Sequence, residues 1–537
     1  MSRPAAGRPD WLVGGLVGMV GIALAALVIR PFEASTIDPD AAASVLYFER
    51  LVAGRRLEAF LPSTPKPLLT FVYGLTWTAV HDWRALTLAT IAVFGLAVGL
   101  AGAWLFRLGG SVVEGAGRQR LAALAAGSFA VIGLITSADL LREVAAANSL
   151  VWAIAGWLVA AHALTGRRVR PRLAGLALLA AGLARFETLA LVGAAGLILL
   201  ARTAAAVRGS ARPVPRGSWL VLAGGLALPI AGLHDQLLTG DPFFWLGVPA
   251  RYTALYLPGA EALAPLDYGR ILVGRYLPDW PLVALAGLGL AVLARSRRRS
   301  ALTGLAGLAG LGAGVILLLF GLAARATYIS NRYYEPLDLV LLAAASIGVG
   351  WLTSLAVRSR RTRAGRVGWP GPALALAAPA VLALALAWPP VPIEPTFEST
   401  LELGRSSSAN LAVDLPRLAQ LAGGPAAGDS PSGPVGAPTA DPGRVALFVP
   451  SLLRPRIAVE TGVSLDRLGD TYAAFQARPA WPGLHVGQWI YHDRAADRPN
   501  ALDRALERVP ALLGRATARV EFADDARGVR ILRVVSP

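Results

Sequence analysis

Two aspartates and one lysine near the N-terminus are the residues of this sequence best suited to chemistry. Asp38 and Asp40 are separated by a proline, and Lys66, the only lysine of the chain, stands between two prolines. A carboxylate can act as a general base, and an ammonium group can bind a phosphate. Flanking prolines restrict the backbone and direct the ammonium, which a lysine that only reaches toward a membrane surface would not require.

The alternative role of the two aspartates is structural. Asp38 is suited to cap a helix that begins at Pro39, and Asp40 would add negative charge to the first turn of that helix. Asp40 is needed less as a cap. We therefore take Asp40 as the first candidate for the base and Asp38 as the second.

Further segments place acids beside arginines and supply the remaining candidate residues. These are Arg332 and Arg185 for binding a phosphate, with Asp139, Arg142, Glu187, Asp241 and Tyr333 in supporting positions. A guanidinium fork matches phosphate oxygens, which favours a phosphorylated ligand. Each cluster could instead be an ion pair that orients helices. The occurrence of all of them at one end of the apolar runs described below favours a common site.

Metal and cofactor chemistry has few ligands available in this sequence. The chain has no cysteine, and its five histidines are widely scattered. Disulfides and thiolate metal sites are therefore excluded. No cofactor is required by any residue pattern, although a divalent metal could bind through the aspartates.

The composition indicates that a bilayer is part of the solvent. Hydrophobic residues make up 55% of 537 residues, more than one soluble core of this length would bury. The formal net charge of +17 comes from arginines in short blocks between apolar runs. Nucleic-acid binding would instead gather basic residues on one face with aromatic residues among them, so it is excluded.

About eleven membrane spans are expected from the apolar runs. Trp11–Ile29 is the first, and it is expected to remain as an anchor because it lacks a small-residue cleavage site. The other runs lie at about 85–106, 121–136, 144–164, 173–184, 188–201, 219–233, 280–294, 301–324, 337–355 and 373–388. The runs at 173–184 and 188–201 could form one kinked element or two tilted helices.

The arginine blocks orient these spans, because cytoplasmic loops carry the excess of basic residues. The loops at 107–120, 165–172, 202–218, 295–299 and 358–366 are rich in arginine and are expected inside. The acid-bearing loops are then outside. This assignment requires that 68–80 does not cross the membrane, and we expect it to lie at the outer interface. Asp38, Asp40 and Lys66 then share one external loop, 30–84.

The predicted fold is an all-α polytopic membrane domain with a small C-terminal α/β domain outside the cytoplasm. The membrane domain covers 1–390, a flexible linker region 391–443, and the α/β domain 444–537. Strands are expected at Val445–Val449 and at Gly528–Val535. The run Gly304–Gly314 superficially resembles a dinucleotide-binding fingerprint, but it lies inside an apolar run, where small residues favour close helix packing.

Taken in order, these motifs resemble those of the GT-C-fold membrane glycosyltransferases, near the protein mannosyltransferase and aminoarabinose transferase group. The likeness covers about 10–390. It is carried by Asp38-Pro39-Asp40, Lys66-Pro67, Arg185-Phe186-Glu187, Gly240-Asp241-Pro242 and Arg332-Tyr333-Tyr334-Glu335-Pro336. The acidic pair of the family is an adjacent Asp-Glu, whereas a proline separates the two aspartates of this chain. Either of them could therefore be the base.

The resemblance implies an inverting glycosyltransferase of the cell envelope, in a multi-pass position in the cell membrane. Its donor would be a polyprenyl-phosphate sugar, and its acceptor a hydroxyl of a protein, lipid or polysaccharide. Asp40 or Asp38 would deprotonate the acceptor, and Lys66 with Arg332 or Arg185 would stabilise the departing lipid phosphate. Membrane lipids would surround it, and nucleic acid would not be a partner.

Two other functions remain open on the sequence alone. One is a transporter or flippase for a lipid-linked or anionic solute, which predicts charged or broken helices near mid-membrane and an inverted repeat. The other is a non-catalytic cell-wall scaffold that binds through its C-terminal domain. The scaffold gives no role to Asp40 and Lys66.

Overall fold

The computed structural model describes most of the chain between residues 39 and 536. The described ranges are 39–61, 63–166, 169–209, 213–256, 265–296, 298–323, 333–363, 395–423, 445–450, 453–471, 485–493 and 517–536, with a few positions between 19 and 27.

Helices dominate these ranges. Those of the first half are α2 (Pro39–Val52), α3 (Pro67–Val80), α4 (Trp83–Ser111), α5 (Ala116–Thr136), α6 (Ala138–Ala145), α7 (Ser149–Thr165), α8 (Pro171–Ala184) and α9 (Thr188–Val207). They are followed by the 3₁₀ helix η2 (Arg216–Leu226), α10 (Ala227–Thr239), α11 (Phe244–Tyr256), α12 (Pro265–Tyr276), α13 (Trp280–Arg295), α14 (Arg299–Ala323), α15 (Glu335–Arg363), α17 (Pro395–Leu421) and α18 (Arg454–Thr461).

Within the described residues, six helices are long and apolar enough to cross a membrane. They are α4, α5, α9, the continuous η2–α10 segment, α14 and α15. Two further pairs qualify only if each is counted as one bent span: α6 with α7 bends by 110°, and α12 with α13 by 97°. These six to eight spans are compatible with a multi-pass membrane protein.

The expected runs correspond to these helices in most places. The runs at 173–184 and 188–201 form two separate helices, α8 and α9, with the break at residues 185–187. The expected interfacial helix is α3, a short apolar helix that packs on α2. The runs Trp11–Ile29 and 373–388 lie outside the described residues, so the count of eleven stays a prediction.

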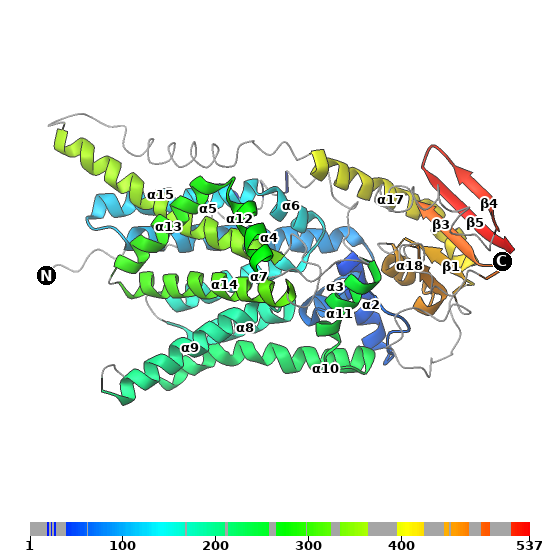
Figure 1. Ribbon diagram of the computed structural model, residues 1–537, viewed down its shortest axis with the longest axis horizontal. Coiled ribbons are helices and arrows are strands. Elements are labelled where there is room, and N and C mark those ends of the chain that lie inside the picture. The colour runs from blue at the N-terminus through cyan, green and yellow to red at the C-terminus, as the bar shows by residue number, and fades with distance from the viewer. Residues whose placement is uncertain are drawn as a thin grey trace.

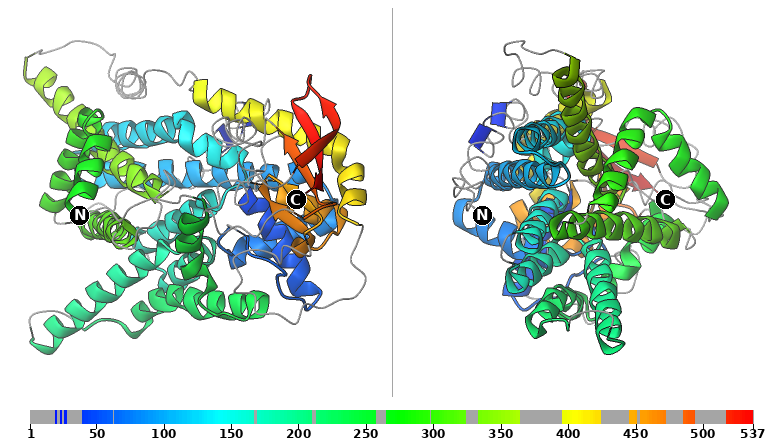
Figure 2. Two further views of the ribbon diagram at one scale, coloured as in Figure 1. Left: turned by 45° about the vertical axis from the view of Figure 1, so that its right-hand side comes forward. Right: turned by 90° about the vertical axis from the view of Figure 1, so that its left-hand side faces the viewer.

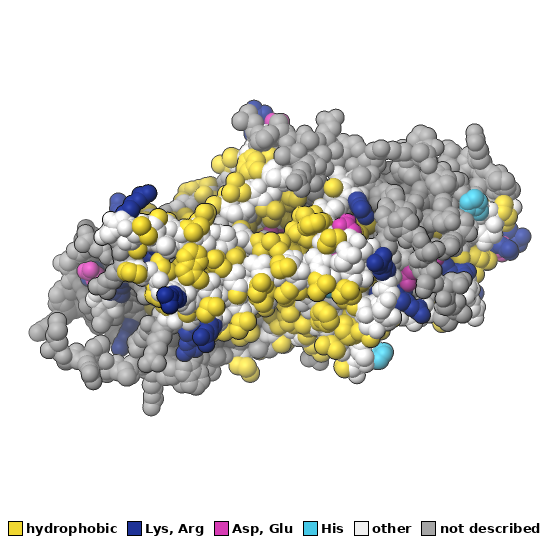
Figure 3. All heavy atoms as spheres, turned by 90° about the horizontal axis from the view of Figure 1, so that it is seen from below, with side chains coloured by type: hydrophobic (Ala, Val, Ile, Leu, Met, Phe, Trp, Pro, Cys, Tyr) yellow, Lys and Arg dark blue, Asp and Glu magenta, His cyan; other side chains and the backbone are white. Residues whose placement is uncertain are grey.

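The helices form an elongated bundle with two unlike ends. Figures 1 and 2 show α2, α3, α18 and the C-terminal sheet gathered at one end, while α9 and α15 run out toward the other. Hydrophobic side chains form a broad band over the middle of the face seen in Figure 3, with lysine and arginine side chains toward the two ends of the band. This distribution suits a surface that faces hydrocarbon in its middle and water at its ends.

Small residues bring several helices into backbone contact. A Cβ atom added at Gly289 of α13 would overlap the carbonyl oxygen of Ala344 in α15. On α14, a Cβ at Gly310 would come within 2.7 Å of Ala194 Cβ in α9, and one at Gly314 would overlap Ala190. Gly310 and Gly314 of the 304–314 run therefore pack α14 against α9, as expected from their place in an apolar run.

The C-terminal domain contains one five-stranded mixed sheet. Its strands are β1 (Leu447–Val449), β2 (Leu468–Asp470), β3 (Trp489–Asp493), β4 (Thr517–Asp524) and β5 (Val529–Ser536), in the order β2-β1-β3-β5-β4. β1 pairs in parallel with β2 and β3, whereas β5 pairs antiparallel with β3 and β4. The strands expected at 445–449 and 528–535 are β1 and β5, so the predicted small C-terminal sheet is confirmed.

Part of the predicted linker region 391–443 is helical rather than extended chain. Pro395–Leu421 is the helix α17, whose Leu411 and Leu418 are fully buried. The prediction of a flexible linker relied on the glycine- and proline-rich sequence after residue 423. It missed the apolar residues between 411 and 421, which belong to the core of the C-terminal domain. Residues 391–394 and 424–443 of this region lie outside the described residues.

Candidate functional site

The N-termini of α2 and α3 meet at the end of the bundle that carries the C-terminal domain. Asp40 lies in the first turn of α2, and Lys66 is the residue that precedes α3. The Lys66 ammonium donates a hydrogen bond of 2.7 Å to Asp40 Oδ2. Their side chains are 13% and 21% exposed, so both groups can be reached from the surface.

Local sequence explains the position of Lys66. Pro67 begins α3 with its fixed backbone angle, and Lys66 is extended with no side-chain hydrogen bond capping the helix. The first backbone bond of α3 runs from Thr70 N to Lys66 O. The positive end of the α3 dipole therefore lies beside the ammonium, and the pair favours an anion there.

A buried hydroxyl holds α3 against the bundle. Tyr73 Oη donates to Ala147 O at 2.7 Å, lies 3.0 Å from Thr90 Oγ1 and accepts from Trp152 Nε1 at 3.0 Å. These partners belong to α4, to α7 and to the turn before α7. Because Tyr73 is fully buried, the network fixes the helix that begins after Lys66.

Tyr47 supports the opposite side of the pair. It lies two turns after Asp40 on α2, is fully buried, and donates to Ser63 O at 2.7 Å. Burial and the nearby Asp40 carboxylate raise the pKa of the Tyr47 hydroxyl well above its usual range. Tyr47 therefore stays protonated, and it ties the segment that leads to Lys66 back to α2.

Arg185 and Glu187 form a buried ion pair at the break between α8 and α9. Arg185 Nη2 and Nε both donate to Glu187 Oε1, and the side chains are 8% and 6% exposed. Burial alone would raise the pKa of Glu187, but Arg185 and, more weakly, Lys66 hold that pKa below its usual range. The ion pair therefore belongs to the same electrostatic neighbourhood as Lys66.

A second set of charges continues from Arg185. Its guanidinium is stabilised by the carboxylates of Glu335 and Glu143 as well as by Glu187. Arg142 Nη2 in turn lies 3.8 Å from Glu335 Oε1 and 3.3 Å from Asp139 Oδ1. The charged residues of α6, of α15 and of the break between α8 and α9 thus meet at one end of the bundle.

Asp241 has a local role in the structure. Its Oδ1 accepts from Phe243 N at 2.9 Å, and its backbone N donates to Thr239 Oγ1. The neighbouring acid Asp235 is fully buried and accepts from Trp245 N at 2.8 Å. The Trp245 ring stacks on Phe186 with 4.1 Å between ring centroids. The segment after the Gly-Asp-Pro loop therefore packs on the break between α8 and α9 through Trp245, and the Asp241 carboxylate accepts a hydrogen bond within its own turn.

Asp38 and Arg332 lie outside the described residues. Tyr333 is half-buried and packs against the main apolar core, next to Tyr334, whose ring lies 4.8 Å from the guanidinium carbon of Arg275.

Several residues of the site carried too weak a signal in the sequence to be chosen. Glu143 and Glu335 are buried acids beside the arginines, but in the sequence they are only parts of mixed clusters. Asp338 accepts from Tyr276 Oη at 2.8 Å and from Arg275 Nη2 at 3.0 Å. Asp338 lies inside the run at 337–355, and an acid within an apolar run was the available signal.

A metal site does not form among the described side chains. No group of three or more histidine, aspartate or glutamate residues lies close enough together there to hold a metal ion. The acids are instead matched with Lys66, Arg142 and Arg185. The described cluster is better suited to an anionic group that competes for these cations than to a cation.

The arrangement offers a carboxylate, an ammonium and two helix N-termini at one accessible point. An ammonium has three donors, so Lys66 can keep its bond to Asp40 and still donate to a phosphate oxygen. The carboxylate of Asp40 can accept a proton from a hydroxyl. No model of a known protein family matches this chain, and no curated protein matches it either.

Proposed function

We propose that this protein is an integral membrane glycosyltransferase that moves a sugar from a polyprenyl-phosphate donor to an acceptor hydroxyl, with inversion at the anomeric carbon. The observation that carries the proposal is the Lys66–Asp40 contact of 2.7 Å at the meeting N-termini of two helices. It joins a phosphate-binding group and a base, which are the two groups that this reaction needs.

The proposed sidedness follows from the arginines. Arg118, Arg208 and Arg298 belong to arginine-rich segments at the end of the bundle opposite α2 and α3, and they favour the cytoplasm. The end with Asp40 and the C-terminal domain then faces the non-cytoplasmic side. Nucleotide sugars are absent there, which favours a lipid-linked donor.

In the proposed reaction, Asp40 accepts the proton of the acceptor hydroxyl as its oxygen attacks the anomeric carbon. The bond from that carbon to the phosphate oxygen breaks on the opposite face, and the electron pair leaves with the lipid phosphate. Lys66 and the N-terminus of α3 stabilise the negative charge that develops on the phosphate. Arg185 acts at longer range, because its guanidinium is engaged by Glu187.

The decisive experiment measures sugar transfer from labelled polyprenyl-phosphate sugars in membranes that contain the protein. Asp40→Asn and Lys66→Ala should each lower the transfer rate by about 10²-fold or more. Asp38→Asn shows whether the second aspartate takes the role of the base. Equal rates in these folded variants and the wild type would reject the proposed site.

A matched control is present near the same loop. Arg50 and Glu58 form an ion pair with 2.9 Å between Nε and Oε1, and their side chains are 12% and 8% exposed. Arg50→Ala and Glu58→Gln break a pair of the same kind without touching Asp40 or Lys66. These variants should keep the transfer rate within about twofold, since their effect is on stability alone.

A transporter or flippase is the second candidate, because the two sharply bent helix pairs resemble the broken helices of transporters. In this function the arginines would line a path for an anionic solute. An assay in vesicles that contain the protein distinguishes the two candidate functions. Movement of a lipid-linked sugar across the bilayer without any transfer to an acceptor favours the transporter.

A further inference from the structure

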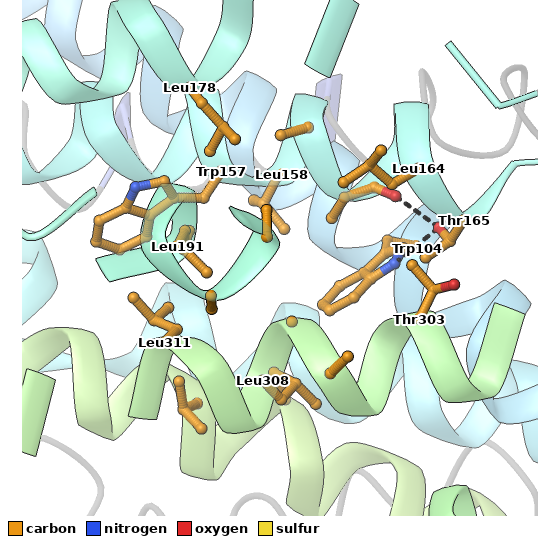
Figure 4. A pocket seen from close by; sticks show the side chains of 18 of the residues that line it. Trp104, Trp157, Leu158, Leu164, Thr165, Leu178, Leu191, Thr303, Leu308 and Leu311 are labelled. Carbon is orange, nitrogen blue, oxygen red and sulfur yellow. Dashed lines mark hydrogen bonds between the residues drawn. The ribbon is translucent and has the colours of Figure 1, made fainter. Parts of the chain in front are cut away.

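A cavity of about 560 Å³ lies between the helices of the bundle and is open at the surface, where Ile198 and Leu302 of its lining are exposed. Its walls come from α4, α5, α7, α8, α9, η2, α14 and α15, and the side chains are mostly those of leucine and alanine. The indole rings of Trp104 and Trp157 lie on one side, and Leu308 and Leu311 of α14 lie on the other (Figure 4). Alanines and glycines leave the space that larger side chains would fill.

The polar atoms of the two indoles are already satisfied by protein partners. Trp104 Nε1 donates to Thr165 Oγ1 at 3.1 Å, and that hydroxyl donates to Ala161 O. Trp157 Nε1 donates to Thr188 Oγ1 at 2.8 Å. Ser218 and Thr303 add hydroxyls to the lining, but a water molecule in a cavity needs two to four polar partners, so the apolar remainder of the space is poorly suited to water. It suits hydrocarbon.

The cavity extends along the bundle toward the arginine-rich end. On α9 it is lined from Leu191 to Arg202, a rise of about 17 Å along the helix axis. Arg202 is exposed and is the charged residue of the lining. On the outside of the same helix, Leu197 and Leu200 are 69% and 58% exposed. An apolar chamber with an arginine at one end therefore adjoins the apolar outer surface of α9.

We propose that this cavity takes one acyl chain of an anionic phospholipid, with the lipid phosphate bound by Arg202. In a bilayer, the apolar surface of α9 is already in contact with lipid chains, and entry of one chain fills space that the side chains leave empty. The proposed phosphate contact at Arg202 lies at the end of the bundle away from Lys66, whereas Leu191, at the other end of the lining, is one helical turn from Glu187. The proposal does not depend on sugar transfer and rests only on the placement of these helices in a membrane.

Trp104 and Trp157 give the site its own reporter. The protein is placed in phosphatidylcholine vesicles that contain phosphatidylglycerol with brominated acyl chains, since bromine quenches indole fluorescence on contact. The difference in fluorescence emission between the wild type and the variants Trp104→Phe and Trp157→Phe gives the emission of these two rings. We expect that contribution to be quenched, and to be quenched more by brominated phosphatidylglycerol than by brominated phosphatidylcholine.

Two pairs of variants test the cavity and the phosphate contact. A Cβ at Gly307 or at Gly321 of α14 would meet nothing within 4 Å, but only Gly307 lines the cavity. Gly307→Leu should abolish the quenching of the two rings, and Gly321→Leu should retain it. Arg202→Gln should weaken the preference for phosphatidylglycerol about fivefold, whereas Arg208→Gln, just after the same helix, should leave the preference unchanged.

The proposal is overturned if the two rings are not quenched in the wild type, or if quenching persists in folded Gly307→Leu. It is also overturned if brominated phosphatidylcholine and phosphatidylglycerol quench equally, or if only a brominated polyprenyl phosphate quenches, since the cavity would then hold a neutral lipid or the proposed donor. If Gly307→Leu fails to fold, the comparison of the two brominated lipids and the Arg202→Gln variant still test the proposal.

Discussion

The guanidinium of Arg454 donates a hydrogen bond of 2.9 Å to the carbonyl oxygen of Phe60, although 394 positions separate the two residues. Its other terminal nitrogen donates to Leu465 O at 2.9 Å, and the side chain is 5% exposed. Phe60 lies on the segment that joins Asp40 to Lys66. The C-terminal domain therefore holds the loop that carries both candidate residues.

Arg454→Ala should loosen this docking, because it removes two charge-assisted hydrogen bonds in a buried place. A loss of about 3 kcal/mol is expected. Ala59 is 4% exposed and belongs to the same apolar core as Ile457 of α18, so a cysteine at position 59 reports undocking. In a chain without native cysteine, Ala59→Cys should react slowly with maleimide alone and rapidly when combined with Arg454→Ala.

The control for that prediction is Arg519→Ala, because Arg519 is 73% exposed on β4 of the same domain. It should leave the maleimide rate at position 59 unchanged. An unchanged rate in the Arg454→Ala protein would mean that the shared apolar core docks the domain without the arginine.

Helix positions were predictable from the sequence wherever an apolar run was long and uninterrupted. The runs at 85–106 and 301–324 correspond to α4 and α14. The sharp bend between α6 and α7 was not predictable, because it depends on Ala147, which has a left-handed φ of 54° that alanine rarely adopts. Such strain is set by tertiary contacts, and the hydrogen bond from Tyr73 to Ala147 O is one of them.

Part of the candidate site was also predictable. Proline on both sides of Lys66 pointed to a directed ammonium, and the structure places that ammonium on Asp40. The link from Arg454 to Phe60 had no sequence signal, because a hydrogen bond to a backbone carbonyl leaves no residue type to recognise. The same holds for Tyr47, whose hydroxyl is bound by Ser63 O.

An exchange of charges separates the structural role of the Lys66–Asp40 pair from its proposed chemical role. The double variant Asp40→Lys, Lys66→Asp keeps an ion pair at the same place, and its free energy of unfolding should stay within about 1 kcal/mol of the wild type. Its transfer rate should still fall by about 10²-fold, since the base and the phosphate-binding group have changed places. Transfer at the wild-type rate would show that only the pairing matters.

For the buried ion pair of Arg185 and Glu187, removal of one partner should destabilise the protein more than removal of both. Glu187→Leu alone leaves Arg185 buried beside one fewer carboxylate, and it should lower the free energy of unfolding by about 3–5 kcal/mol. Arg185→Met combined with Glu187→Leu should recover most of that loss, as judged by thermal unfolding in detergent. If the double variant is less stable than the single one, Glu335 and Glu143 are sufficient to stabilise the buried Arg185 without Glu187.

A fall in pH should lower the stability of the folded protein through protonation of Glu187. Since the pKa of Glu187 is lowered in the folded state, its contribution to stability is present above the unfolded pKa of about 4.3 and is lost as the pH falls through the lowered folded value. The wild type should therefore lose thermal stability below about pH 5. The Arg185→Met, Glu187→Leu protein should have a shallower slope there, and parallel slopes would contradict the assignment.

Sidedness can be tested because the chain lacks cysteine, so that single cysteines can be introduced at exposed arginines. Arg55 lies between α2 and α3, Arg519 lies on β4, and Arg208 and Arg298 belong to the arginine-rich loops. In intact cells, a membrane-impermeant maleimide should label cysteines at 55 and 519 but reach those at 208 and 298 only after permeabilisation. The reverse pattern would place Asp40 and Lys66 in the cytoplasm, where nucleotide sugars are available, and would remove the reason for a lipid-linked donor.

Labelling of 55 and 519 from opposite sides is incompatible with the Arg454–Phe60 contact, because that contact requires both segments on one face.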